Sequence, residues 1–214
     1  MKTRLGISLA VLLSAASALA SPITFTFVGT DSGSLGGTPF SPSTITITAV
    51  ADTANLVSNP CCGATSAVPD NSTVVTISGL GTFTFTSQTE VWWLTSLAFG
   101  GLGAYNGNPN TILGANLVDV GDSSLAGWNE NTSIGPVINP TTGNFTQWTL
   151  VDEQTNAGQL IFNDGGSPSS FQASVAAAPE PEVASLLLLG AGLLGTAALS
   201  RLRKGTGPKG AARA

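Results

Sequence analysis

The amino-acid sequence predicts an all-β fold, an antiparallel β-sandwich ectodomain over residues 21–178. Short runs alternate Thr with Ile, Val or Phe, and this period of two is typical of half-buried strands. Clusters rich in Gly, Asn, Asp and Pro separate the runs, as turns do. No helical period interrupts the region, and its 158 residues suffice for one domain with its own core. An N-terminal signal peptide and one C-terminal transmembrane helix are expected to flank this domain.

The signal peptide is expected to occupy residues 1–20. Lys2 and Arg4 precede a short apolar run, and small residues follow up to Ala18-Leu-Ala20. Signal peptidase cleaves after such an A-x-A sequence, so the mature protein is expected to begin at Ser21. An uncleaved anchor is the alternative, although the apolar run is short for about 30 Å of hydrocarbon.

The strands of the ectodomain are predicted from the alternating runs. Turns are expected at 31–34, 79–81, 105–109, 139–143 and 163–166, and the Gly/Asn-rich stretch 97–114 is expected to be a long loop. The expected strands are 23–27, 44–48, 73–77, 82–86, 91–98, 112–120, 147–151, 158–163 and 171–175. Alternation then directs inward Phe25, Phe27, Ile45, Ile47, Phe83, Phe85, Trp148 and Leu150.

The charge of the ectodomain excludes several functions. Residues 21–178 contain ten acidic residues and no Lys, Arg or His, a formal charge of −10 that the whole-chain value of −5 conceals. No side chain can therefore neutralise phosphate, so nucleic acid and anionic lipid are not expected as partners of this domain. Without His, Ser-His-Asp or Cys-His catalysis and His-ligated metal sites are excluded as well.

The two cysteines, Cys61 and Cys62, are adjacent. In an oxidising compartment such a pair can form a strained vicinal disulfide, crosslink to another chain, or stay reduced, and the sequence leaves these alternatives open. No further Cys or His stands at ligand spacing, so no metal site is expected here.

The C-terminal region predicts a membrane anchor. Residues 183–200 are uninterrupted apolar sequence, long enough for one crossing, and Arg201, Arg203 and Lys204 follow as a stop-transfer cluster. The positive-inside rule places residues 205–214 in the cytoplasm and the ectodomain outside.

Pro179-Glu180-Pro181 stands directly before this anchor. The two prolines favour an extended conformation that a membrane protease could bind. The order Pro-Glu-Pro, apolar helix and basic cluster, over residues 179–204, resembles the PEP-CTERM sorting segment of Gram-negative bacteria. The resemblance implies recognition by an exosortase, a membrane transpeptidase-like cysteine protease, and release to the cell surface or an exopolysaccharide matrix.

The ectodomain itself is expected to be non-catalytic, with no cofactor and no bound metal, and to meet exopolysaccharide or other matrix components. One alternative is a carbohydrate-binding module that uses loop aromatics, with Trp128 as the best candidate beside Trp92, Trp93, Trp148 and Tyr105. A carboxylate-only glycosidase is a weaker alternative. Calcium ligands, less expected than solvated carboxylates, would be Asp119, Asp122, Asp152, Glu153 and Asp164.

Overall fold

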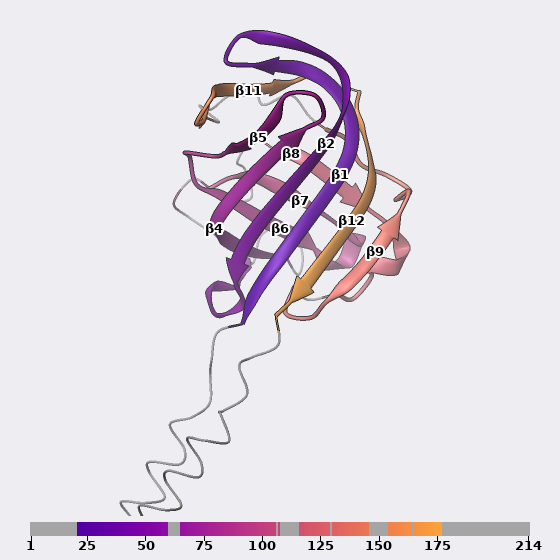
Figure 1. Cartoon of the computed structure of the whole chain (residues 1–214). Coiled ribbons are helices and arrows are strands. Elements are labelled where there is room, and N and C mark those ends of the chain that lie inside the picture. Colours follow the sequence, from indigo (N-terminus) through magenta and orange to yellow (C-terminus); the bar gives the residue numbers. More distant parts are fainter. Residues whose placement is uncertain are drawn as a thin grey trace, which may run out of the picture. The chain divides into compact units, whose positions relative to one another are not determined.

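The computed structural model confirms a mostly antiparallel β fold and describes residues 21–59, 65–105, 107, 116–128, 130–145, 154–163 and 165–176. Its strands belong to one curled sheet (Figure 1). In chain order they are β1 (Pro22–Leu35), β2 (Thr38–Asp52), β3 (Val57–Asn59), β4 (Thr65–Ile77), β5 (Gly81–Thr84), β6 (Thr89–Leu94), β7 (Phe99–Ala104), β8 (Asn116–Gly121), β9 (Ile134–Ile138), β10 (Gln154–Thr155), β11 (Gly158–Phe162) and β12 (Ser167–Val175). Single 3-10 turns are η1 (Thr53–Asn55), η2 (Thr95–Leu97) and η3 (Ser123–Leu125).

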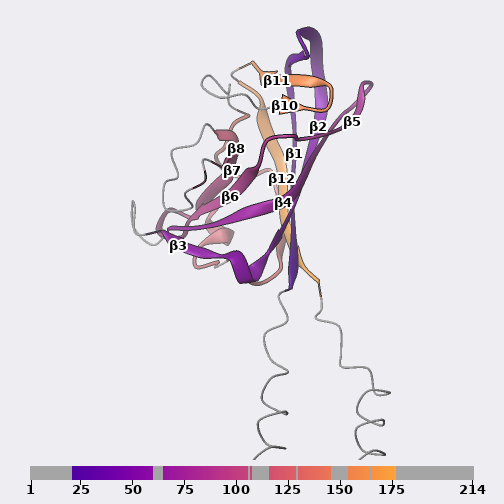
Figure 2. The same cartoon turned by 90° about the vertical axis from the view of Figure 1, so that its left-hand side faces the viewer.

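The sheet curls into two layers that enclose the core. Its hydrogen-bonded order is β10-β11-β1-β2-β4-β6-β7-β8. Strand β12 pairs with the first part of β1, and β9 pairs with β12. Figure 2 shows the layers nearly edge-on, with β1, β2 and β12 on one side and β6, β7 and β8 on the other. The arrangement is sandwich-like, but the two layers are continuous with each other.

Strand β4 makes that continuity, because it belongs to both layers. Its second half pairs with β2 from Ile77↔Ile45 to Ser72↔Val50, while its first half pairs with β6 from Thr65↔Leu94 to Pro69↔Glu90. The register with β2 shifts at Asp70, where the strand passes from one layer to the other. Such an irregularity bends a strand and increases its twist, so Asp70 lies at the corner of the fold.

The far ends of the sheet are also connected by isolated bridges. Phe145 bridges Val118 of β8 on one side and Gly166, just before β12, on the other. Backbone bonds accompany these bridges, from Asp119 N to Asn144 O at 2.9 Å and from Phe145 N to Gly166 O at 2.9 Å. The hydrogen-bonded path therefore returns from β8 towards β12 and β1.

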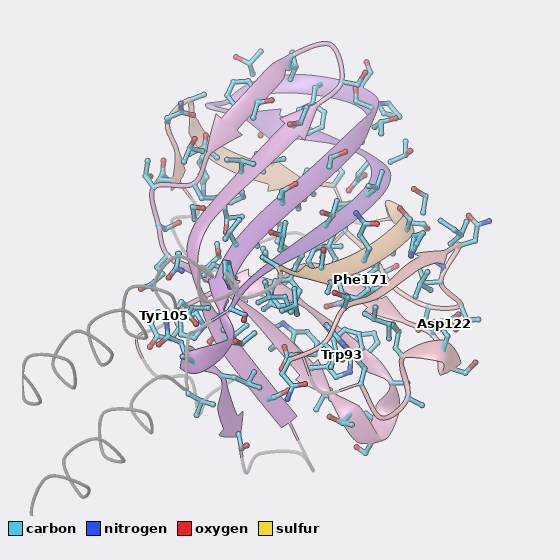
Figure 3. The ribbon with its side chains drawn as sticks, turned by 60° about the horizontal axis from the view of Figure 1, so that its bottom comes forward. Trp93, Tyr105, Asp122 and Phe171 are labelled. Atoms are coloured by element: carbon cyan, nitrogen blue, oxygen red, sulfur yellow. The ribbon has the colours of Figure 1, made fainter. Side chains whose placement is uncertain are left out.

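The predicted core is largely confirmed. Phe25, Phe27, Ile45 and Ile47 are fully buried and Phe85 is 7% exposed, whereas Phe83 is only half-buried. Trp148 and Leu150 lie outside the described residues. The two layers meet at an aromatic cluster, defined here as Phe25, Trp93, Trp128 and Phe171. Trp93 of one layer stacks on Phe171 of the other with ring centroids 5.7 Å apart and an interplanar angle of 20° (Figure 3).

Two expectations for loops and turns are wrong. The stretch 97–114 was expected to be a loop because it is rich in Gly, yet it contains β7, which pairs with both β6 and β8. A Cβ at Gly100 would collide with the Trp93 ring, so glycine here admits a large ring against the strand. Residues 31–34, expected to be a turn, lie within β1 at a bulge between Asp31 and Gly33.

The first and last strands of the domain are neighbours. Ile23 of β1 lies opposite Val175 of β12, and Ala176 N donates to Pro22 O at 2.8 Å. The chain divides into two units, residues 1–176 and residues 177–214. None of the helices in the described part of the chain is long and apolar enough to cross a membrane, and the predicted span 183–200 lies outside that part.

Candidate functional site

Most of the residues predicted for export and sorting, together with the two cysteines of the possible disulfide, lie outside the described residues. They are Ala18, Ala20, Cys61, Cys62, Pro179, Glu180, Pro181, Arg201, Arg203 and Lys204. Ser21, the predicted first residue of the mature protein, is described and already belongs to the domain. Its carbonyl accepts hydrogen bonds from Thr53 N at 3.2 Å and Thr53 Oγ1 at 3.1 Å.

Trp128, the predicted ligand platform, belongs to the core instead. It is 6% exposed, and its ring meets Trp93 edge-to-face at 4.8 Å and Phe171 at 5.7 Å. Its Nε1 donates to Thr132 O at 2.9 Å, so the polar tip of the ring is satisfied inside its own loop. Trp92 and Trp93 are 3% and 0% exposed. A flat aromatic surface for a sugar ring is therefore not provided by these three tryptophans.

A polar hollow of about 390 Å³ opens at the corner of the fold, and we call it the Asp70 hollow. The first part of its lining is the middle of β4, and the second is the link from β5 to β6. That link runs back along β4, where Phe85 N donates to Thr73 O at 2.9 Å. The lining residues are Asp70, Asn71, Ser72, Thr73, Phe85, Thr86, Ser87, Gln88 and Thr89.

Asp70 is held at the hollow by two buried hydroxyls. Thr89 Oγ1 donates to Asp70 Oδ2 at 2.7 Å, and Thr73 Oγ1 lies 2.6 Å from Thr89 Oγ1 and 3.4 Å from the same carboxylate oxygen. Among the described residues no donor reaches Asp70 Oδ1. Burial raises the pKa of Asp70 to about 7, although the hydroxyls of Thr89 and Thr73 oppose this effect.

Two further carboxyls are buried near Asp70, which sequence reasoning did not anticipate. Glu90 of β6 is 2% exposed and Glu130, between η3 and β9, is 1% exposed. Burial raises the pKa of each to about 8, and repulsion from Asp70 acts in the same direction. The hydroxyl of Ser66 lowers the pKa of Glu130 in part. Because the domain has no Lys, Arg or His, protonation is the available way for these groups to avoid buried charge.

The expected calcium ligands do not gather into a site in the described part of the chain. No group of three or more acidic, His or Cys side chains there is placed to hold a metal ion. Asp122 instead caps η3, accepting from Ser124 N at 2.9 Å and Ser124 Oγ at 2.7 Å. Burial raises the pKa of Asp119 to about 6. Asp152, Glu153 and Asp164 lie outside the described residues.

Comparison with known proteins adds no relative to this description. No protein-family model, no curated protein and no solved structure matches the chain. The similarity of residues 179–204 to the PEP-CTERM segment therefore stays a prediction from the motif.

Proposed function

We propose that the chain is an exported, non-catalytic protein of the cell surface or extracellular matrix of a Gram-negative bacterium, sorted by an exosortase. The observation that carries the proposal is the order of parts in the sequence. Pro179-Glu180-Pro181, the apolar residues 183–200 and the basic cluster Arg201, Arg203 and Lys204 follow one another directly. A signal peptide at the other end of the chain fits the same route.

The end of the ectodomain supports this proposal. β12 ends at Val175, and Ala176 still bonds to Pro22, so the described sheet is finished before the motif begins. Cleavage at residues 179–181 removes no strand of this sheet. An exosortase could thus release the domain without unfolding it, while uncleaved protein would keep residues 183–200 as its anchor.

A structural role in the matrix is supported by the polar outer surface of the sheet. Alternation leaves a series of hydroxyls on the side of β1 and β2 that faces away from the core. Thr26 of β1 lies opposite Thr48 of β2, and Thr46 of β2 lies opposite Thr76 of β4. Together with the formal charge of −10, this surface favours solubility and hydrogen bonding to hydrated polymers.

The alternative of a carbohydrate-binding module based on loop aromatics loses support, because Trp92, Trp93 and Trp128 are buried. A carboxylate-only glycosidase needs an acid and a second carboxylate on opposite sides of an accessible glycosidic bond. Glu90 and Glu130 have raised pKa values but are almost completely covered. Neither lines the Asp70 hollow, so the carboxyls do not favour this alternative.

Mass spectrometry of the protein from cells with and without the exosortase tests the sorting proposal. We expect the mature chain to begin at Ser21 and, with the enzyme present, to end at or near residues 179–181. A variant with Pro179→Ala and Pro181→Ala removes the extended tripeptide and should keep its C-terminus. Pro168→Ala, in β12, is a proline control that should be processed normally. An intact C-terminus through Ala214 in both strains would leave a permanent single-pass anchor.

A further inference from the structure

The Asp70 hollow has features of a binding site that the core of the domain does not share. Its volume of about 390 Å³ lies within the range of small-ligand pockets, about 300–1,000 Å³. Asp70, Thr73 and Thr89 at its inner end are 4%, 3% and 1% exposed. Asn71, Ser72, Thr86 and Gln88 at its outer part are exposed. The hollow therefore combines fixed, buried polar groups with an accessible rim.

The buried end of the hollow has an acceptor that the described part of the chain leaves without a donor. Asp70 Oδ2 receives the Thr89 hydroxyl, whereas Asp70 Oδ1 receives no hydrogen bond there. A buried acceptor without a partner destabilises the fold, because it has lost its hydrogen bond to water and gained none in return. Oδ1 has almost no exposed surface in this structure, so a hydroxyl group from outside reaches it only if the side chains that cover it move aside. Such a hydroxyl would then donate to Oδ1 and accept from a neighbouring threonine or amide.

The chemistry of the lining restricts the ligand. Hydroxyl and amide side chains both donate and accept, which suits a ligand whose groups do the same. No cationic side chain occurs anywhere in residues 21–178, so an anionic ligand would have no counter-charge beside Asp70. In the described residues no third acidic, His or Cys side chain is placed to complete a metal site. Neutral polyols remain as the matching chemical class.

We propose that the Asp70 hollow binds one neutral sugar unit of an uncharged glycan, with the Asp70 carboxyl as the buried hydrogen-bond acceptor and Thr73 and Thr89 as the residues that position it. The site differs from the aromatic platform expected from the sequence, because recognition depends on hydroxyls and a carboxyl instead of ring stacking. It is independent of the sorting proposal, since the hollow is built within residues 70–89 whether or not the C-terminus is cleaved.

The test uses the full chain, purified in a zwitterionic detergent because detergents with sugar headgroups would compete. The probes are glucose, mannose and galactose, dextran as a neutral polymer, glucuronic acid as an anionic control and calcium chloride alone. Saturation-transfer NMR identifies the bound probe, and calorimetry measures its Kd. We expect a Kd of about 1 mM or lower for at least one neutral probe. Binding of dextran without free hexoses would identify the polymer as the source of the sugar unit.

Asp70→Asn should weaken this binding at least tenfold. Asp122→Asn makes the same substitution at the cap of η3, which does not line the hollow, and should leave the Kd within twofold. If Asp70→Asn does not fold, Ser72→Phe, at an exposed position of the rim, obstructs the hollow without altering the buried end and should also weaken binding at least tenfold.

Four outcomes would overturn the proposal. They are failure of every neutral probe to bind the folded wild-type chain, wild-type affinity in both hollow variants, glucuronic acid binding as tightly as the neutral sugars, and calcium binding alone that Asp70→Asn abolishes. Sorting is measured on the C-terminal mass of the protein, so neither result decides the other.

Discussion

The aromatic cluster and the Asp70 hollow occupy the same face of strand β6 and differ completely in chemistry. Thr89 and Trp93 stand four residues apart, about 13 Å along the strand, with the fully buried Val91 between them. Around Trp93 the layers meet through rings that bury apolar surface from both sides. Around Thr89 the interior contains a carboxyl and hydroxyls. The aromatic cluster therefore contributes most to stability. The region of the Asp70 hollow contributes less, because it buries polar groups in place of apolar surface.

Removing the centre of the aromatic cluster should have the largest effect. Trp93→Ala deletes a fully buried ring that touches both Trp128 and Phe171, and we expect a loss of about 3–5 kcal/mol in the free energy of unfolding. Urea denaturation of the full chain, followed by circular dichroism, measures it. Leu97→Ala, at a side chain that is 67% exposed, is the control and should change stability by less than about 0.5 kcal/mol. A loss below about 1 kcal/mol for Trp93→Ala would show that the aromatic cluster is not the main source of stability.

The polar interior should make stability depend on pH. Asp70, Glu90 and Glu130 have folded pKa values raised to about 7, 8 and 8, so between pH 4 and 8 the folded state binds more protons than the unfolded state. Stability should then be greatest near pH 4–5 and fall as pH rises to about 8, by at most about 1.4 kcal/mol per pH unit for each group. Denaturation midpoints at pH 5 and pH 8 check the sign, and a higher midpoint at pH 8 would refute it.

Glu130→Gln should reduce this slope, because glutamine cannot ionise. At pH 4 Glu130 is neutral in the folded state and largely neutral in the unfolded chain, so stability should be nearly unchanged, whereas at pH 7 the variant should be more stable by up to about 3 kcal/mol. Asp122→Asn should not flatten the slope, since the pKa of Asp122 is lowered by its bonds to Ser124 and its titration ends below this range. Equal slopes for wild type and Glu130→Gln would show that Glu130 is not the buried proton carrier.

The smallest effect is expected at the hollow itself. Thr89→Val keeps the shape of a side chain that is 1% exposed but deletes the 2.7 Å hydrogen bond to Asp70 Oδ2. We expect a loss of about 1–3 kcal/mol at pH 5 and a further rise in the pKa of Asp70, since the lost hydroxyl favoured the ionised form. NMR titration of the Asp70 carboxyl measures the shift. Thr82→Val, at an exposed Thr76–Thr82 pair, is the matched control and should leave that pKa unchanged.

The sequence predicted the regular part of the fold well, because strand alternation records which side of a sheet is buried. Phe25, Phe27, Ile45 and Ile47 follow this rule without exception. The rule failed where a contact with a neighbouring strand determined the backbone conformation. Glycines in β7 indicated a loop, yet Gly100 leaves room for the Trp93 ring, and no local pattern reports a partner across the strand.

The candidate site was harder to predict than the fold. Asp70 and Glu130 entered the sequence analysis only through the formal charge of −10, and no burial was predicted for them, because acidic residues are rarely buried without a partner. Their burial comes from the bend of β4 and from the loop after η3, which depend on contacts distant in sequence. Trp128 stood in a Gly/Asn-rich segment and was expected at the surface, although the same segment folds its ring inward against Phe25. The absence of basic residues was the signal that could have directed attention to protonated carboxyls.

The pairing of the first and last strands also has a mechanical consequence. Ile23 and Val175 lie opposite each other at one end of antiparallel neighbours, so tension between the two termini would open the β1–β12 ladder one hydrogen bond at a time. A domain tethered through its C-terminus and pulled at the Asp70 hollow experiences a similar load. Val175, Ile23, Ala51 and Asp70 lie in one row across β12, β1, β2 and β4, so the force then runs across the strands and loads the terminal hydrogen bonds of β12 first. A pull applied through a captured polymer would therefore separate β12 from β1 from the same end as a pull on the two termini.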